Sequence, residues 1–308
     1  MANRYLVALA SPLAAAGCHS DATALPTTAP KQVSMVASGG FSSPTDAVAS
    51  PDGRDFYFAA FDSMNVPAIF HTPSAPGGAP NAVDEIASGD PLDLPIGLVM
   101  ACDGKTVYVA DMGGANGAVL AVATGGGTPA DLGVTDMFRP GGLAMGPDCK
   151  QLYATGRTDD GQPALFQIPI AGGPATAIWI GDPLVSPTGL HVDHEGVAWV
   201  MDHLAAGANG EGVLFAIPSD GSAANEVISG LVMGTPGGVS LVAGGGTAVM
   251  PTRDANGKAQ LTSVEIATGE MQQLATPDIQ DPAGLRTARE AGVFAVVDSE
   301  GGAIYRAE

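Results

Sequence analysis

Apolar residues in this chain occur in short runs that are separated by turns rich in glycine, proline and aspartate. Residues 95–100 and 107–110 are two such runs, and an Asp-Gly turn lies between them at 103–104. The runs are apolar at consecutive positions, without alternation, which is typical of strands packed on both faces of their sheet. No helical period of useful length accompanies them. The pattern therefore predicts an all-β chain of short strands and tight turns.

These two runs belong to a unit that returns six times. Each unit opens on a proline, usually with a glycine close behind it, and continues through an apolar strand and a turn into a second strand. Successive opening prolines are 51, 45, 47, 49 and 46 residues apart, within the range of one four-stranded propeller blade. The chain from about residue 32 to its end is thus expected to be one domain, a six-bladed β-propeller. The opening prolines are Pro44, Pro95, Pro140, Pro187, Pro236 and Pro282.

The two ends of the repeat region complement each other. After the last opening proline there is room for only three strands, the final one at 303–306, whereas a lone strand at 32–36 precedes the first proline. We expect the N-terminal strand to supply the missing outer strand of the last blade. Such closure removes an exposed sheet edge and joins the two ends of the ring.

The first 31 residues are expected to lie outside the fold. Residues 1–18 have the features of a secretory signal peptide, with Arg4 near the start and small residues before Cys18. The segment 15–18 resembles a bacterial lipobox, which predicts acylation of Cys18; plain cleavage nearby and a short disordered tail are the alternatives. Residues 19–31 would form a flexible tether to the propeller at 32–308. We expect an exported protein, periplasmic or a lipoprotein of the outer membrane or cell surface, that touches the membrane only through this anchor.

Charge narrows the range of partners. The chain has 12 basic and 32 acidic side chains, a formal net charge of −20, which repels phosphate backbones and anionic lipid and argues against nucleic-acid binding. The charge is compatible with cation binding, although an acidic exterior that keeps a glycine-rich protein soluble is the simpler explanation. We expect a monomer whose partner is a protein or a small-molecule ligand.

Two cysteines besides Cys18 occupy equivalent turns of adjacent units. Cys102 and Cys149 would be able to form a disulfide between two blades in an oxidising compartment, and free buried thiols are the alternative. Neither has the spacing of a metal site.

Three carboxylates are candidate metal ligands. Propeller sites commonly lie at the channel mouth where loops leading into the inner strands meet loops that join the second and third strands. On this register the second strand ends in Asp111, Asp202 and Asp298 in units two, four and six. If these side chains face one another across the axis, they would offer oxygen ligands to Ca²⁺. Calcium is the one cofactor that the sequence suggests. The alternative is that each Asp accepts hydrogen bonds within its own turn.

Unit four is the most polar and supplies the candidate catalytic residues. His203 and Glu211, on a long loop, are a histidine and a carboxylate of the kind that general acid–base catalysis requires. His191, on the inner strand, is the third candidate. Its equivalents in units five and six are Ser240 and Arg286, so we expect these side chains to cluster between blades four to six as a hydrogen-bond network.

The repeat resembles known families. Pro-x-Gly-Leu openings, the strand Val107–Asp111 and Gly-rich turns ending in Pro129 and Pro174 resemble NHL and YWTD-type six-bladed propellers, and in particular the Gly-Gly-Xaa-Pro repeat proteins exported by many bacteria. The resemblance covers nearly all of the chain from residue 32 and implies a fold and a binding role, not an activity.

A more distant resemblance leads to enzymes, the gluconolactonase and senescence-marker family and virginiamycin B lyase. The first implies a divalent metal held by an acidic residue of the first blade and by Asn residues, one of them directly after an opening proline. No opening proline is followed by Asn here, so Asp46, Asp202 and Asp298 would have to build another site. The lyase would use His203 and Glu211. The chain contains no G-x-S-x-G, phosphate-binding or HExxH motif.

The sequence thus favours an exported, lipid-anchored propeller that acts as a binding or interaction module at the bacterial cell envelope. A metal-assisted lactonase or lyase, with its site at the channel mouth, is the alternative.

Overall fold

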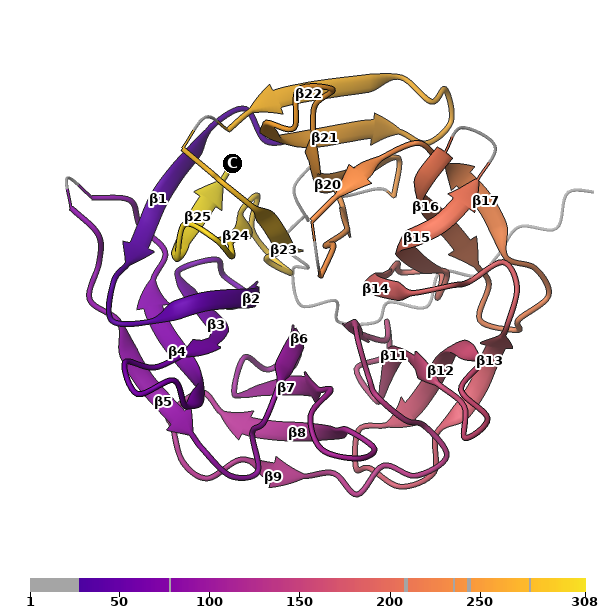
Figure 1. Cartoon of the computed structure of the whole chain (residues 1–308), viewed down its shortest axis with the longest axis horizontal. Coiled ribbons are helices and arrows are strands. Elements are labelled where there is room, and N and C mark those ends of the chain that lie inside the picture. Colours follow the sequence, from indigo (N-terminus) through magenta and orange to yellow (C-terminus); the bar gives the residue numbers. More distant parts are fainter. Residues whose placement is uncertain (1–27, 78, 208–209, 235, 243–244, 277) are drawn as a thin grey trace, which may run out of the picture.

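The structure is a computed structural model that describes residues 28–308, except 78, 208–209, 235, 243–244 and 277. Its strands form six sheets arranged as blades around a central axis (Figure 1). Throughout the described residues there is no helix, and therefore no helix long and apolar enough to cross a membrane. The predicted all-β, six-bladed propeller is confirmed.

Each blade is an antiparallel meander whose first strand lies nearest the axis. Blades 1 to 3 comprise, in order, β2 (Ser42–Ala49), β3 (Asp55–Phe61), β4 (Pro67–Pro73) and β5 (Asp84–Ser88); β6 (Pro95–Met100), β7 (Thr106–Asp111), β8 (Ala118–Ala123) and β9 (Ala130–Asp131); and β10 (Leu143–Met145), β11 (Gln151–Arg157), β12 (Pro163–Pro169) and β13 (Thr176–Ile180). Blades 4 to 6 comprise β14 (Pro187–Val192), β15 (Ala198–Gly207), β16 (Gly210–Ile217) and β17 (Asn225–Ile228); β19 (Ser240–Leu241), β20 (Thr247–Arg253), β21 (Ala259–Glu265) and β22 (Met271–Ala275); and β23 (Pro282–Thr287), β24 (Phe294–Asp298), β25 (Ala303–Ala307) and β1 (Val33–Ser38). In blade 5 an extra short strand, β18 (Val232–Met233), also pairs with β20.

The N-terminal strand closes the ring as predicted. β1 pairs antiparallel with β25, so that Val33 lies opposite Ala307 and Ser38 opposite Ala303. The backbone N–H groups of Lys31 and Gln32 both donate to the carbonyl oxygen of Glu308, at 2.7 and 3.0 Å. Residues about 270 positions apart in the chain therefore share one sheet.

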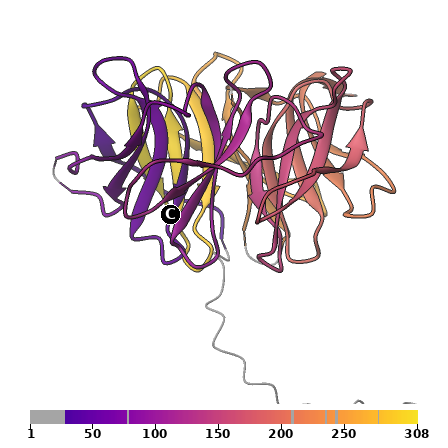
Figure 2. The same ribbon diagram turned by 90° about the horizontal axis from the view of Figure 1, so that it is seen from below.

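The two faces of the ring differ in their connections. We call the face that carries the turns between the first and second strands, such as 50–54, the turn face. The loop face carries the loops that lead into the inner strands, such as 89–94, and those that join the second and third strands, such as 62–66. Figure 2 shows the ring edge-on, with the strands running between these faces. Because β25 ends on the turn face, both ends of the propeller lie there.

The hydrophobic core consists of six clusters, each lying between two adjacent blades. Phe56 and Phe58 of β3 illustrate this division, because each packs into a cluster shared with blade 6, whereas Tyr57 packs toward blade 2. Both faces of an inner sheet are thus buried, which explains why the strands are apolar at consecutive positions.

Two inner strands begin later than their sequence pattern predicts. β10 begins at Leu143 and β19 at Ser240, although runs beginning at 140 and 236 were expected. Before β10, contacts to Thr155 of β11 in the same blade continue: Gly141 N–H donates to the Thr155 carbonyl at 2.8 Å, and Gly142 N–H donates to the Thr155 hydroxyl at 2.7 Å. Before β19, Gly238 N–H donates to the Ala283 carbonyl of the next blade at 3.2 Å. The start of β19 is thus bound to the neighbouring blade, whereas the start of β10 stays bound within its own blade.

The glycine of the repeat is explained by the crowding of the inner strands around the axis. A Cβ atom on Gly97 would lie 2.2 Å from the carbonyl oxygen of Gly141 in the next blade, and one on Gly142 would lie 2.2 Å from that of Thr188. No side chain fits at such a separation, so the glycine permits the close approach of neighbouring blades.

Candidate functional site

A pocket of about 360 Å³ lies at the turn-face end of the central channel. This volume falls within the range of small-molecule sites. Every blade contributes the same inner-strand position to its wall, the second residue after the repeat glycine or its equivalent. In blades 1 to 6 these residues are Val48, Val99, Ala144, His191, Ser240 and Arg286.

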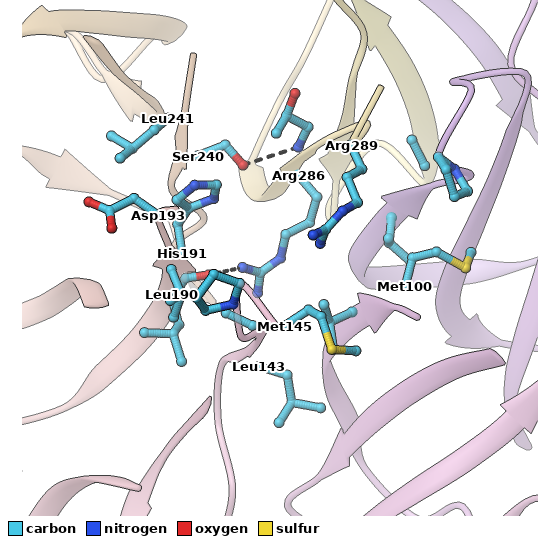
Figure 3. Close-up of a pocket in the computed structure, with 18 of the residues that line it drawn as sticks. Met100, Leu143, Met145, Leu190, His191, Asp193, Ser240, Leu241, Arg286 and Arg289 are labelled. Atoms are coloured by element: carbon cyan, nitrogen blue, oxygen red, sulfur yellow. Dashed lines mark hydrogen bonds between the residues drawn. The ribbon is translucent and has the colours of Figure 1, made fainter. Parts of the chain in front are cut away.

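The wall is divided into an apolar and a polar half. Blades 1 to 3 contribute aliphatic and thioether side chains, among them Val99, Met100 and Met145, whereas blades 4 to 6 contribute His191, Ser240 and two arginines. Figure 3 shows the guanidinium groups of Arg286 and Arg289 directed into the pocket. The six-fold symmetry of the fold therefore surrounds a chemically asymmetric site.

Arg286 forms a brace across the channel. Its Nε and Nη2 donate to the Asp46 carboxylate of blade 1 at 3.2 and 3.1 Å, and its Nη1 donates to the carbonyl oxygen of Leu190 in blade 4. Asp46 also accepts the backbone N–H of Leu98 in blade 2 at 2.9 Å. One buried ion pair thus connects four of the six blades.

Burial raises the pKa of Asp46, and the neighbouring Arg286 guanidinium, together with backbone N–H donors, opposes that rise. Arg286 is 8% exposed, and its guanidinium forms an ion pair with the Asp46 carboxylate. Its charge is consequently compensated within the protein and is not free for a ligand.

His191 is held neutral at physiological pH. Burial, and to a smaller extent the charges of Arg286 and Arg289, lower its pKa to about 4, and the Asp193 carboxylate acts in the opposite direction. Among the described residues the imidazole has no hydrogen-bond partner, so its ring nitrogens offer one donor and one acceptor to the pocket.

The neighbouring polar groups are unevenly satisfied. The Ser240 hydroxyl oxygen accepts the Thr287 N–H at 3.0 Å, while its own hydrogen has no acceptor within the described part of the chain. The Asp193 carboxylate accepts the Trp199 indole N–H at 2.9 Å and the N–H groups of Glu195 and Val197, at 3.0 and 2.9 Å. The remaining capacity of this site is therefore mainly that of a hydrogen-bond donor.

The three candidate metal ligands do not converge. Asp111 accepts the N–H groups of Asp93 and Leu94, Asp202 those of Val185 and Ser186, and Asp298 those of Gln280 and Asp281, at 2.7–3.1 Å. In each case the two donors directly precede the opening proline of the same blade. Each carboxylate therefore fixes its own loop, as in the alternative interpretation. The described residues contain no group of three or more His, Cys, Asp or Glu placed to hold a metal ion.

The structure separates the three candidate catalytic residues. His203 lies toward the loop face, where its Nδ1 is 3.5 Å from the Thr188 hydroxyl. Glu211 is exposed and lies opposite Ala206 in the strand pair β15–β16. Within the described residues no hydrogen bond or ion pair joins Glu211 to His203, and His191 lies at the other end of the channel. Of the three, only His191 lines the pocket.

Cys102 and Cys149 lie near the turn-face end of the channel, where the pocket is. Cys102 and Cys149 form a disulfide between the turns of blades 2 and 3, with Cα atoms 6.0 Å apart. Ala101 and Pro147, close to these cysteines in the chain, line the pocket. Cys18 lies outside the described residues.

Sequence reasoning pointed to the loop-face mouth, whereas the pocket is at the turn face. It placed His191, Ser240 and Arg286 together, but the expected hydrogen-bond network is wrong for these side chains: Ser240 and Arg286 bond to backbone groups, and no hydrogen bond joins the three among the described residues. It also missed Arg289 and the partnership of Asp46 with Arg286. One sequence feature could have indicated the latter: Asp46 stands where the other five inner strands have glycine.

Comparisons with known proteins support the fold alone. No family model and no curated protein matches the sequence. Similar solved structures include a chain of a nidogen–laminin complex (18% identity, TM-score 0.58, covering 75% of this chain and 82% of that one). A putative TolB from Agrobacterium tumefaciens is 15% identical, with a TM-score of 0.55 and coverage of 87% and 90%. A protein of unknown function from Bacteroides thetaiotaomicron is 13% identical, with a TM-score of 0.62 and coverage of 94% and 74%.

Proposed function

We propose that this chain is a binding module, exported and attached to the bacterial cell envelope through Cys18, and that the turn-face pocket binds a small molecule. The observation that supports the proposal is the pocket itself, about 360 Å³ in volume, with an apolar half and with polar groups that have no partner among the described residues. TolB-like propellers share the fold, and a periplasmic location is part of the proposal rather than a consequence of that likeness.

The enzymatic alternative has less support. Asp111, Asp202 and Asp298 are occupied by backbone donors of their own blades. His203 and Glu211 have no contact with each other among the described residues. The part of the pocket that the structure describes has no hydrogen-bonded nucleophile–base pair and no metal-binding group, which favours binding over catalysis.

A thermal-unfolding screen tests the proposal. The wild type and two variants are heated with a library of small molecules and, separately, with CaCl₂ and ZnCl₂. Val99→Trp fills the pocket, and Val185→Trp adds the same bulk at an exposed position on the loop face. We expect ligands to raise the unfolding midpoint of the wild type and of Val185→Trp but not of Val99→Trp, because a ligand stabilises only the state that binds it.

Library hits that stabilise Val99→Trp as strongly as the wild type would contradict the assignment of the pocket. A saturable midpoint increase with calcium or zinc would instead favour the metal-assisted lactonase or lyase.

A further inference from the structure

The polar half of the pocket presents hydrogen-bond donors that have no acceptor in the described part of the chain. Arg289 is exposed at the rim, its guanidinium is directed into the pocket (Figure 3), and it takes part in no hydrogen bond or ion pair among the described residues. The Ser240 hydroxyl hydrogen and the neutral His191 ring are the other free donors. Their common complement is a ligand group with several acceptor oxygens.

The other charged groups around the pocket leave Arg289 as its uncompensated cation. Arg286 is paired with Asp46, and the Asp193 carboxylate, which keeps its negative charge, accepts three N–H groups, from the Trp199 indole and from its own turn. His194 lies 4.0 Å from Glu195, an exposed pair. Glu290 is also exposed, and its backbone N–H donates to the Pro51 carbonyl. A group bearing a single negative charge would therefore meet one free guanidinium, which binds carboxylates in a bidentate manner.

The wall formed by blades 1 to 3 is apolar and fits the hydrocarbon part of a ligand. Val48, Val99 and Ala144, with Met100 and Met145 beside them, offer methyl, methylene and thioether surface. Burial of apolar ligand surface against such a wall is favourable by about 25 cal/mol per Å². Methionine side chains adapt to chains of varied shape.

We infer that the turn-face pocket binds an amphiphilic monocarboxylate, with its carboxylate on Arg289, Ser240 and His191 and its apolar body on the wall of blades 1 to 3. This inference rests on the proposed function and specifies its ligand class. A dianion is disfavoured because the described residues give the pocket one free cation, Arg289, and the protein has a formal net charge of −20. A sugar-like ligand is disfavoured because the apolar wall offers its hydroxyl groups no partners.

Titration calorimetry with paired ligands tests the inference. Octanoate and octanamide have almost the same shape and differ in charge, and butyrate has four methylene groups fewer than octanoate. We expect octanoate to bind at least tenfold more tightly than octanamide. Affinity should rise by up to about fourfold for each methylene added between butyrate and octanoate, since each buried methylene contributes about 0.8 kcal/mol.

The matched variants are Arg289→Gln and Arg54→Gln. Both remove one positive charge from an exposed arginine on the turn face, but Arg54 lies outside the pocket and pairs with Asp52 at 3.5 Å. Arg289→Gln should weaken octanoate binding by about tenfold or more, in keeping with the loss of a charge-assisted contact, and leave octanamide binding unchanged. Arg54→Gln should leave both unchanged.

Two results would overturn the inference. If octanoate and octanamide bind equally and Arg289→Gln changes neither, the pocket binds small molecules of another class and the proposed function stands. If no member of the series binds, the monocarboxylate assignment fails, and the library screen with Val99→Trp then decides separately whether the pocket binds anything.

Discussion

Asp46 occupies the inner-strand position at which the other five blades have glycine, and Arg286 occupies one at which blades 1 and 2 have valine. The two exceptions meet where the neighbouring blades 6 and 1 adjoin, although they are 240 positions apart in the chain. A Cβ on Gly284 would lie 2.2 Å from the Asp46 carboxylate, so the glycine of blade 6 makes room for the aspartate of blade 1. The two residues that depart from the repeat, Asp46 and Arg286, are thus partners of each other.

A double-mutant cycle tests the coupling of this pair. Asp46→Gly and Arg286→Val, which each restore a residue of the repeat, should each lower the free energy of unfolding by about 3–5 kcal/mol, because each leaves a buried charge without its partner. The double variant should lose clearly less than the sum of the two. Urea denaturation measures all four proteins, and additive losses would show that the two residues act independently.

The three strand-end aspartates illustrate what sequence reasoning can distinguish. Their occurrence in alternate blades was visible in the sequence, and it is compatible with both a shared cation and separate turns. Asp202, which accepts N–H donors on both sides of the strand end, from Ser186 and Ala205, is fully buried. The decision between the two interpretations depends on side-chain direction, which the spacing of residues does not contain.

At the scale of elements, the inner strands could be recognised in the sequence because each is marked by neighbouring residues, an opening proline followed by an apolar run. The opening prolines of β6, β14 and β23 are the first residues of those strands, as predicted. β19 begins later than expected because Gly238 is bound to the next blade, whereas the segment before β10 stays bound to β11 of its own blade. Strand existence followed from the repeat, whereas strand boundaries depended on individual hydrogen bonds, in β19 on one to the adjacent blade.

The disulfide joins the inner turns of two adjacent blades and closes a loop of 47 residues. A cross-link of this span stabilises by about 4 kcal/mol on a chain-entropy model. We expect the double variant Cys102→Ala, Cys149→Ala to lose a free energy of unfolding of this order in urea titrations under oxidising conditions. Dithiothreitol should destabilise the wild type to a similar extent and leave the double variant unaffected. Equal stability of the oxidised wild type and the variant would contradict a structural role for the bridge.

At the scale of the whole molecule, the two faces of the ring differ in character. The pocket and both ends of the propeller lie on the turn face. Of the eight large hydrophobic side chains that are exposed within residues 28–308 as described, six lie on the loop face instead, where a protein partner would find apolar contacts. They are Met64, Leu94, Ile180, Val185, Leu204 and Val232.

An anchor at Cys18 would orient these faces. The distance that 13 residues, 19–31, can span is at most about 45 Å. Acylation would therefore hold the turn face, with its pocket, near the membrane surface, from which an amphiphilic ligand would enter.

Cell fractionation tests the anchor. In a bacterial host that processes lipoproteins, the wild-type chain should appear in the membrane fraction with an acylated N-terminal cysteine by mass spectrometry. Cys18→Ser should move it to the soluble fraction, and Ser20→Ala, a change of similar size beside it, should not. A wild type found in the soluble fraction without acylation would contradict the lipoprotein assignment.

The sequence by itself determined the strand order, the number of blades and the closure by β1, because these follow from a local pattern repeated six times and from the number of strands at the two ends. Tertiary structure decided where the site lies and what forms it. Asp46, Arg286 and His191 come together because the inner strands converge on one axis, with Arg289 in the turn just after β23, and the direction of each side chain there depends on neighbours from other blades. A repeat specifies which residues are equivalent, but contacts across the axis determine which of them have partners and which remain free to bind a ligand.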